Sequence, residues 1–426
     1  MPRPAVDSAA RAALRTAAWG AGHLMMRPPR LPEVPAAVAA VAEHAGASLG
    51  DGTLRAMVEE LPGPRNRLYA VDAMQRTEAA LAAALSGSGF EVRLQPFTET
   101  QVEGYGDGGR GDRVIYPRLD GVNVIARKPG KATSNAIVVI AHYDTVRDSP
   151  GADDNTASLV ALLQLARILA PYQFSDSIIL AATDLEERGY FGARRLVRQL
   201  TGEYQAVLGI NLECIAYTCG DPGSQRVAAG LDVLYPHQVR RLRRDGLRGD
   251  FTCVIYNQPA RRTAAFLGGA LARFDSVPPV LMREPSGLPV LGPLLRARVP
   301  GVRQFGRSDH IAFWEAGLPA IQVTDTADLR SPHYHQPSDT ADRLDYRRLR
   351  GVIMAAACAV AAAAGCAEGP RKAAKLQAVE APRIAAQQFF PVGVADVLPG
   401  TKGFRALRPV AVPVRIIAGE HYEVRS

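Results

Sequence analysis

The segment AIVVIAHYD, residues 136–144, is an unbroken apolar run that ends abruptly in polar residues, and this pattern is the strongest indication of the fold class. Runs of the same form are SIILAATDLEE (177–187), AVLGINLECIA (206–216) and LPAIQVTDT (318–326). Helical patterns separate them, notably TASLVALLQLARILA (156–170). Short apolar strands that alternate with helices are typical of a parallel sheet with helices on both faces. We therefore predict an α/β fold with a largely parallel central β-sheet sandwiched by helices.

Polar residues follow each predicted strand at its carboxyl end, where sheets of this kind carry their ligand sites. His142 directly follows the first strand, and Asp144 stands two residues later. A lone histidine in such a place is more often a structural hydrogen-bonding group. A metal-binding imidazole, however, needs an acceptor that fixes its tautomer, and Asp144 can supply it. Asp153 and Asp154 come next, before the helical pattern, and a single helix cap accounts for only one of these two carboxylates.

Carboxylates also end the next two predicted strands. Glu186 and Glu187 follow SIILAAT, so they point into the same crevice as His142. In that crevice one glutamate can bind a metal while the other handles protons. Glu213 interrupts the apolar run 206–216. A buried glutamate without a partner is costly, and a metal ion is the natural partner here.

Histidines gather in the same regions. Four of the eight histidines lie at predicted strand ends or in adjoining loops: His142, His310, His333 and His335. Two imidazoles and three carboxylates are about what two zinc ions need when one carboxylate bridges them. Nitrogen and oxygen ligands with a proton-handling glutamate alongside favour catalytic over structural zinc.

Six strings in a fixed order resemble the di-zinc aminopeptidase family, whose relatives include glutamate carboxypeptidase and glutaminyl cyclase. They are AHYDT, SPGADDNTAS, DLEERGYFGAR, INLECIAY, SDHIAFWEAGLPAIQVTDT and PHYHQPSDTADRLDY, and the resemblance covers about residues 54–365. It implies a zinc-exopeptidase fold, which is an aminopeptidase-like three-layer sandwich. It also implies a metallo-exopeptidase that releases N-terminal residues from peptides.

The resemblance further implies two zinc ions per chain, for which cobalt or manganese could substitute. Asp153 would bridge the two ions, with Glu187 and His335 completing one site and His142 and Glu213 the other.

Other roles also follow from the resemblance. Glu186 would be the general base, which takes a proton from the attacking water and passes it to the leaving amine. Asp144 would orient His142, and Asp154 would follow an unusual cis peptide bond after Asp153. Asp309 and Asp339 resemble residues that support the ligands.

Two departures from the family pattern bear on the substrate. Glu213 stands where better-known aminopeptidases carry Asp, and the extra methylene changes the position of the ion or the space for the amine. Glutaminyl cyclases lack the first His-x-Asp ligand, so His142 argues against cyclisation.

Two alternatives stay open. One is an amidase or carboxypeptidase on a non-peptide or acidic substrate, whose carboxylate Arg261 and Arg262 could bind. The other is a non-catalytic metal-binding protein, which degenerate ligands would mark, and none of the ligands is degenerate.

Composition excludes several classes. Apolar residues make up 47% and charged residues 22% of 426, as in ordinary globular proteins. The net charge of +8 comes with only 6% aromatic residues and scattered arginines, so we predict no nucleic-acid partner. Five cysteines without a paired spacing argue against a disulfide scaffold.

Arginines interrupt the apolar N-terminal runs, and the run 354–364 is too short to span a bilayer, so we predict no membrane association and a cytoplasmic location. The partner would be a peptide or a small amide, and the oligomeric state is left open.

The chain divides into three predicted regions. Residues 1–45 are rich in Ala, Pro and Arg and predict a loosely held arm, residues 46–366 form the di-zinc peptidase domain, and residues 367–426 form an extension with a β-hairpin around Ala418 and Gly419. Within the domain, the glycine-rich stretch VEGYGDGGRGDR (102–113) predicts an exposed loop.

Overall fold

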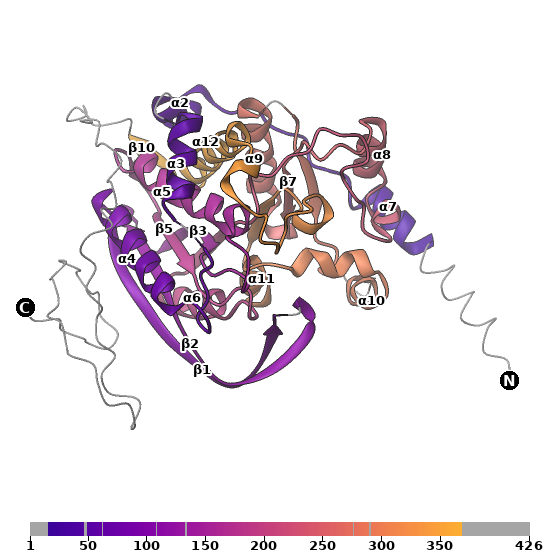
Figure 1. Ribbon diagram of the computed structural model, residues 1–426. Coiled ribbons are helices and arrows are strands. Elements are labelled where there is room, and N and C mark those ends of the chain that lie inside the picture. Colours follow the sequence, from indigo (N-terminus) through magenta and orange to yellow (C-terminus); the bar gives the residue numbers. More distant parts are fainter. Residues whose placement is uncertain are drawn as a thin grey trace, which may run out of the picture.

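The computed structural model describes residues 16–46, 49–61, 63–107, 109–132, 134–275, 277–288 and 291–368. Within them, an eight-stranded sheet has the order β1-β2-β5-β3-β6-β9-β7-β8, and helices cover both of its faces (Figure 1). One face carries α5 (Ala157–Leu169), α9 (Arg261–Phe274) and α12 (Tyr346–Ala363). The other carries α6 (Phe191–Glu203) and α11 (His310–Glu315). The predicted α/β sandwich is confirmed.

The centre of the sheet is parallel, as predicted. It consists of β5 (Ser177–Thr183), β3 (Asn135–His142), β6 (Ala206–Leu212) and β9 (Ala320–Thr324). Side chains of β3 alternate between the two cores: Ile137 and Val139 face α5, whereas Val138 and Ile140 face α6. Because both faces are buried, every residue of the strand from Ala136 to Ala141 is apolar, which explains the unbroken run.

The prediction of a largely parallel sheet is wrong at both edges. β1 (Glu91–Gly106) and β2 (Gly109–Lys128) pair antiparallel, and β2 is also antiparallel to β5. Their connection is only a short turn, which permits no parallel crossover. At the other edge, β7 (Cys253–Tyr256) runs antiparallel to β9 and parallel to β8 (Val280–Arg283).

The glycine-rich stretch 102–113 is mostly strand, so the predicted exposed loop is wrong there. Gly104 pairs with Val114 and Tyr105 with Arg113, close to the tip of the long curved hairpin that β1 and β2 form (Figure 1). A Cβ atom on Gly104 would collide with the carbonyl oxygen of Arg188. This glycine therefore permits a close approach of two backbones and does not mark a turn.

Part of the predicted N-terminal arm packs against the domain. Residues 16–24 are helical, and α2 (Ala36–Gly46) packs on α12 with Ala39, Val41 and Ala42 buried. Met26 is buried in a cluster with Leu234 and Tyr235. The described part of the arm is thus not loosely held. The predicted hairpin around Ala418 and Gly419 lies outside the described residues.

The remaining elements connect this frame. Two helices directly precede β1: α3 (Asp51–Glu59) and α4 (Val71–Gly87). The other elements follow β3 in the chain: the π-helical turn Ala152–Thr156, β4 (Gln173–Phe174), α7 (Leu231–Leu234), α8 (Pro236–Arg244), Gln258–Ala260, α10 (Leu291–Arg298), Pro300–Gly306, Ala327–Leu329, Ala341–Arg343 and β10 (Cys366–Glu368). Among the described residues, no helix combines the length and the apolar character that crossing a membrane requires.

Shortening a side chain of β3 tests this layered core. We expect Ile140→Ala to lower the free energy of unfolding by about 2–5 kcal/mol, because Ile140 is fully buried next to the strand end that carries His142. Ile115→Ala is the matched control, since Ile115 is 66% exposed on the hairpin and should cost less than about 0.5 kcal/mol. Urea unfolding followed by circular dichroism measures both. Equal losses in the two variants would contradict this account of the core.

Candidate metal centre

The carboxyl ends of the central strands bring five polar segments together. His142 ends β3, Glu186 and Glu187 follow β5, and Glu213 follows β6. Parallel pairing places these strand ends at one edge of the sheet. The turn before α5 adds Asp154, and the loop after β9 adds a histidine at position 335.

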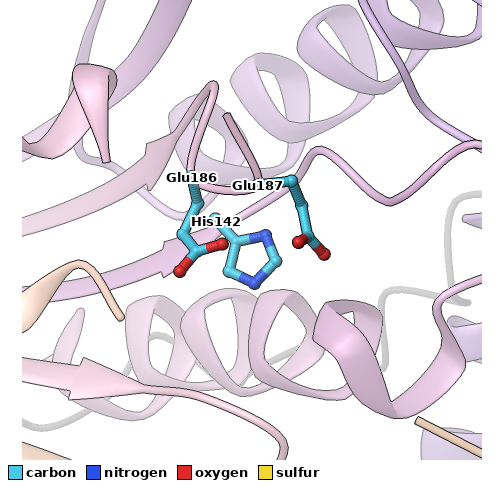
Figure 2. A group of neighbouring side chains, drawn as sticks. All are labelled: His142, Glu186 and Glu187. Atoms are coloured by element: carbon cyan, nitrogen blue, oxygen red, sulfur yellow. The ribbon is translucent and has the colours of Figure 1, made fainter. Parts of the chain in front are cut away.

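The ligand atoms of these residues form three overlapping groups. In each group the nitrogen and carboxylate oxygen atoms lie within 4.8 Å of one another: His142 with Glu186 and Glu187, His142 with Asp154 and Glu213, and Asp154 with Glu187 and His335. Figure 2 shows the first group, in which the two glutamates descend on either side of the His142 ring. Residues that are up to 193 positions apart in the chain, from His142 to His335, thus meet in one place.

Asp154 lies at the middle of this arrangement. Its Oδ1 is 3.1 Å from Nε2 of His142, and its Oδ2 is 3.2 Å from Nε2 of His335. Glu213 Oε2 lies 3.3 Å from the same nitrogen of His142, and Glu187 Oε2 lies 3.3 Å from that of His335. Each imidazole therefore faces one oxygen of Asp154 and one glutamate.

Asp153, which we expected at this central position, points elsewhere. Its Oδ1 accepts a hydrogen bond from the backbone nitrogen of Ala216 at 2.9 Å. The cis peptide bond joins Asp154 to Asn155, one residue later than we expected. Because neighbouring side chains of this turn point in different directions, the structure brings Asp154 into the groups in place of Asp153.

The unpaired atoms of the centre fit a divalent metal. Within the described residues, both oxygens of Asp154, Oε1 of Glu187 and Nε2 of His335 are buried and have no hydrogen-bond partner. Buried polar atoms without partners are costly, and positive ions can supply the missing interactions. The Nδ1 atom of His142 lies 3.0 Å from the carbonyl oxygen of Asp144. If this nitrogen donates to that oxygen, Nε2 keeps its lone pair for a metal.

Two further carboxylates hold the ligand turns in place. Asp144 accepts hydrogen bonds from the backbone nitrogens of Glu186 and Glu187, both at 3.1 Å. Asp339 does the same for Asp153 and Asp154, at 2.9 and 3.1 Å. The oxygen Oδ1 of Asp144 is also 3.5 Å from Nδ1 of His142. Asp144 thus contacts the histidine that we expected it to orient, and in addition it fixes the turn of the two glutamates.

Sequence reasoning missed two residues that hold Glu213. The hydroxyl group of Ser308 donates to Glu213 Oε2 at 2.7 Å. Asn155 donates to the carbonyl oxygen of Leu212 at 3.0 Å and accepts from the backbone nitrogen of Cys214 at 3.2 Å. Asn155 stands inside the string SPGADDNTAS and Ser308 starts the string SDHIAF, so their positions in the motifs were the available signal.

Two of the four highlighted histidines stay outside the groups. His310 Nε2 lies 2.6 Å from the carbonyl oxygen of Phe305, and His333 Nδ1 lies 2.9 Å from the hydroxyl of Ser338. Asp309, which we expected to support the ligands, accepts a hydrogen bond from the hydroxyl of Thr183. Burial raises the pKa of Asp309 to about 7.

Two carboxyl groups of the centre have pKa values that are shifted in opposite directions. Burial raises the pKa of Glu186 well above its ordinary range, against the effect of the nearby His142. Burial also acts to raise the pKa of Asp154, but the close imidazoles of His142 and His335 outweigh it and lower that pKa. Glu186 can therefore hold a proton under conditions in which Asp154 is ionised.

A cleft of about 910 Å³ opens beside the centre, and His335 forms part of its wall. The tip of the hairpin contributes Tyr105 and Arg113, and residues 302–307 line another side. The two arginines that begin α9, Arg261 and Arg262, are not among the residues that line this cleft.

Comparison with known proteins agrees with this architecture. The solved aminopeptidase from Aneurinibacillus sp. strain AM-1 superposes with a TM-score of 0.53 at 14% identity, over 78% of this chain and 98% of that one. The fold is thus that of an α/β protein with a candidate metal site at the carboxyl ends of its central strands. Residues 123–236 and 295–360 match the model of Peptidase family M28, in agreement with the family that the sequence motifs resemble.

Curated relatives extend the comparison. The uncharacterized protein YfbL of Escherichia coli is 31% identical over 236 residues, which are 53% of this chain and 66% of the relative. A probable zinc metalloprotease of Pyrenophora tritici-repentis is 26% identical over 338 residues, 70% of this chain and 63% of the relative. Aminopeptidase YwaD of Bacillus subtilis is 26% identical over 236 residues, 54% of this chain and 41% of the relative. The chain thus spans less than two thirds of the length of each of these relatives.

Proposed function

We propose that the protein is a zinc-dependent aminopeptidase that releases N-terminal residues from peptides. The observation that supports this most strongly is the buried carboxylate of Asp154, which lies 3.1 and 3.2 Å from two imidazoles and has no hydrogen-bond partner among the described residues. The relatives of the chain include proteins named a probable zinc metalloprotease and an aminopeptidase. The nitrogen and oxygen atoms of the centre are ligands that catalytic zinc accepts.

In this proposal Asp154 would contribute one carboxylate oxygen to each of two zinc sites. Glu187 and His335 complete one site, and His142 and Glu213 complete the other, in keeping with the contacts of each imidazole. When bound, such a pair of ions lowers the pKa of a water molecule towards neutrality and polarises the carbonyl group to be attacked. Cobalt or manganese could substitute, because both accept the same ligands.

Glu186 moves the proton in the proposed reaction. Its carboxylate is 4% exposed, and its atoms lie within 4.8 Å of those of His142 and Glu187. Burial raises the pKa of this carboxyl group, which favours its taking up the proton that leaves the water molecule. Asp144, through its bonds to the backbone of Glu186 and Glu187, keeps this carboxylate at the centre.

The first test is a substrate panel with and without a chelator. We expect the protein to cleave aminoacyl anilides with a free amino group, to lose activity on strong chelation, and to regain it with zinc or cobalt. Elemental analysis should find zinc in the active protein. Cleavage of N-blocked substrates alone would favour an amidase, whereas bound metal without any cleavage would favour a non-catalytic metal-binding protein. Active protein without a divalent metal would contradict the zinc centre.

Variants of Asp154 and of its neighbour Asp153 test which of these two carboxylates binds the zinc ions. We expect Asp154→Asn to lower zinc affinity at least about 100-fold, since residues that merely support ligands already account for roughly 10- to 100-fold. Asp153→Asn is the matched control, because an amide oxygen can still accept from the nitrogen of Ala216. Competition with a chromophoric chelator measures affinity, and unfolding midpoints check that both variants fold. The opposite order of affinities would assign the bridge to Asp153.

Removing the charge of Glu186 tests its proton transfer. We expect Glu186→Gln to retain zinc and to reduce turnover by about 10²- to 10⁴-fold, which is the usual contribution of general acid–base catalysis. Glu203→Gln, a change at an exposed glutamate of α6, should leave turnover and zinc content unchanged. Near-normal turnover of the Glu186 variant would exclude this residue from the role.

A further inference from the structure

Positive charge dominates the wall of the cleft beside the metal centre. Four arginines line it, against two carboxylates: Arg113, Arg296, Arg303 and Arg307 against Glu284 and Asp328. The arginines come from two sides, since one belongs to the tip of the β1–β2 hairpin and the others to α10 and the segment after it. In Figure 1 the hairpin tip ends close to α10, in agreement with the shared lining.

Both lining carboxylates already have partners. Glu284 accepts hydrogen bonds from the backbone nitrogens of Ser286 and Gly287, at 2.6 and 3.2 Å. Asp328 pairs with Arg307 at 2.8 Å. These two acids are therefore poorly placed to attract a cationic ligand into the cleft.

Two of the arginines, Arg296 and Arg303, form no ion pair within the described residues, although Arg296 is close enough to Glu284 for its charge to act against the rise that burial causes in the pKa of that carboxyl group. Arg303 donates to the carbonyl oxygens of Arg296 and Ala297, at 3.4 and 3.0 Å, and carbonyl oxygens carry no net charge. Within the part of the chain that the structure describes, neither Arg296 nor Arg303 has a carboxylate within ion-pair distance of 4.0 Å. The cleft therefore offers two guanidinium groups to an anionic ligand, and these groups bind carboxylates well.

The cleft meets the metal centre at His335, the one residue of the three ligand groups among its lining residues. The released residue of an aminopeptidase substrate carries an ammonium group next to the carbonyl that is attacked, and the arginine wall repels that group. The part of the substrate that extends along this wall is thus the leaving part. A cleft of about 910 Å³ accommodates a drug-sized ligand, which corresponds to a short peptide.

We propose that the cleft selects short peptides whose leaving part ends in a free carboxylate, and that Arg296 and Arg303 bind this carboxylate. The inference rests on the proposed peptidase function and adds to it a substrate class. Because both arginines are exposed, the gain over a neutral end is modest, roughly three- to tenfold in affinity.

The test compares two peptides that differ only at the C-terminus, Leu-Ala-Ala and its C-terminal amide. We expect the full-length, zinc-loaded protein to cleave the free acid with a kcat/KM roughly three- to tenfold higher, mainly through KM, and the preference to shrink as salt is added. The double variant R296Q/R303Q should lose this preference by slowing cleavage of the acid, with little effect on the amide. The matched control is R298Q, a change at an exposed arginine of α10 that does not line the cleft.

Binding measurements keep the two proposals separate. Calorimetric titration of the same protein with Ala-Ala and with Ala-Ala amide reports carboxylate recognition whether or not cleavage occurs. Tighter binding of the acid that R296Q/R303Q abolishes supports the inference, even if neither peptide is cleaved and the aminopeptidase proposal fails. Equal binding and equal cleavage of acid and amide, or a preference that persists in R296Q/R303Q, would overturn it.

Discussion

The buried carboxylate of Asp154 lies between two imidazoles, and much of the surrounding structure holds it there. A charge removed from water is costly unless charges and hydrogen bonds of the protein replace the solvent. The chain pairs buried carboxylates with backbone N–H groups. Asp339 accepts two such bonds from the turn before α5, and Asp144 accepts two from the turn after β5. Both ligand turns are therefore fixed by hydrogen bonds that do not use the ligand side chains, so those side chains remain available to the metal.

The parallel centre of the sheet could be predicted because burial on both faces leaves a clear mark in the sequence. Each run is apolar along the strand and becomes polar at the carboxyl end, where the candidate centre lies, so His142 and Glu213 stood out at the ends of the runs. The edges carry no such mark. The hairpin has one exposed side, and its glycines suggested a loop although Gly104 serves a close contact with Arg188. Antiparallel edges thus escaped a prediction based on the central pattern.

From the sequence we predicted which segments form the candidate centre, and for some of these segments also which residue lies in it. We expected Asp153 at the centre, whereas Asp154 lies in two of the three groups; their turn is irregular, and periodicity says nothing about such a turn. Asp154 has φ −110° and ψ 82°, which no helix or strand pattern implies. Ser308 was missed for another reason, since its contact with Glu213 joins residues 95 positions apart. Contacts of this kind depend on the assembled sheet and leave no local signal.

The turn of the two glutamates is also connected to the wall of the cleft. Arg188 follows Glu187 directly, and its guanidinium donates to the carbonyl oxygen of Tyr105 at 3.2 Å and to Asp107 at 2.5 Å. The backbone of the same arginine accepts from the nitrogen of Tyr105 at 3.0 Å. The hairpin tip is thus hydrogen-bonded to the segment that carries the proposed ligand and the proposed base. Since Tyr105 and Arg113 line the cleft, the position of this wall and the position of the glutamates are set by the same contacts.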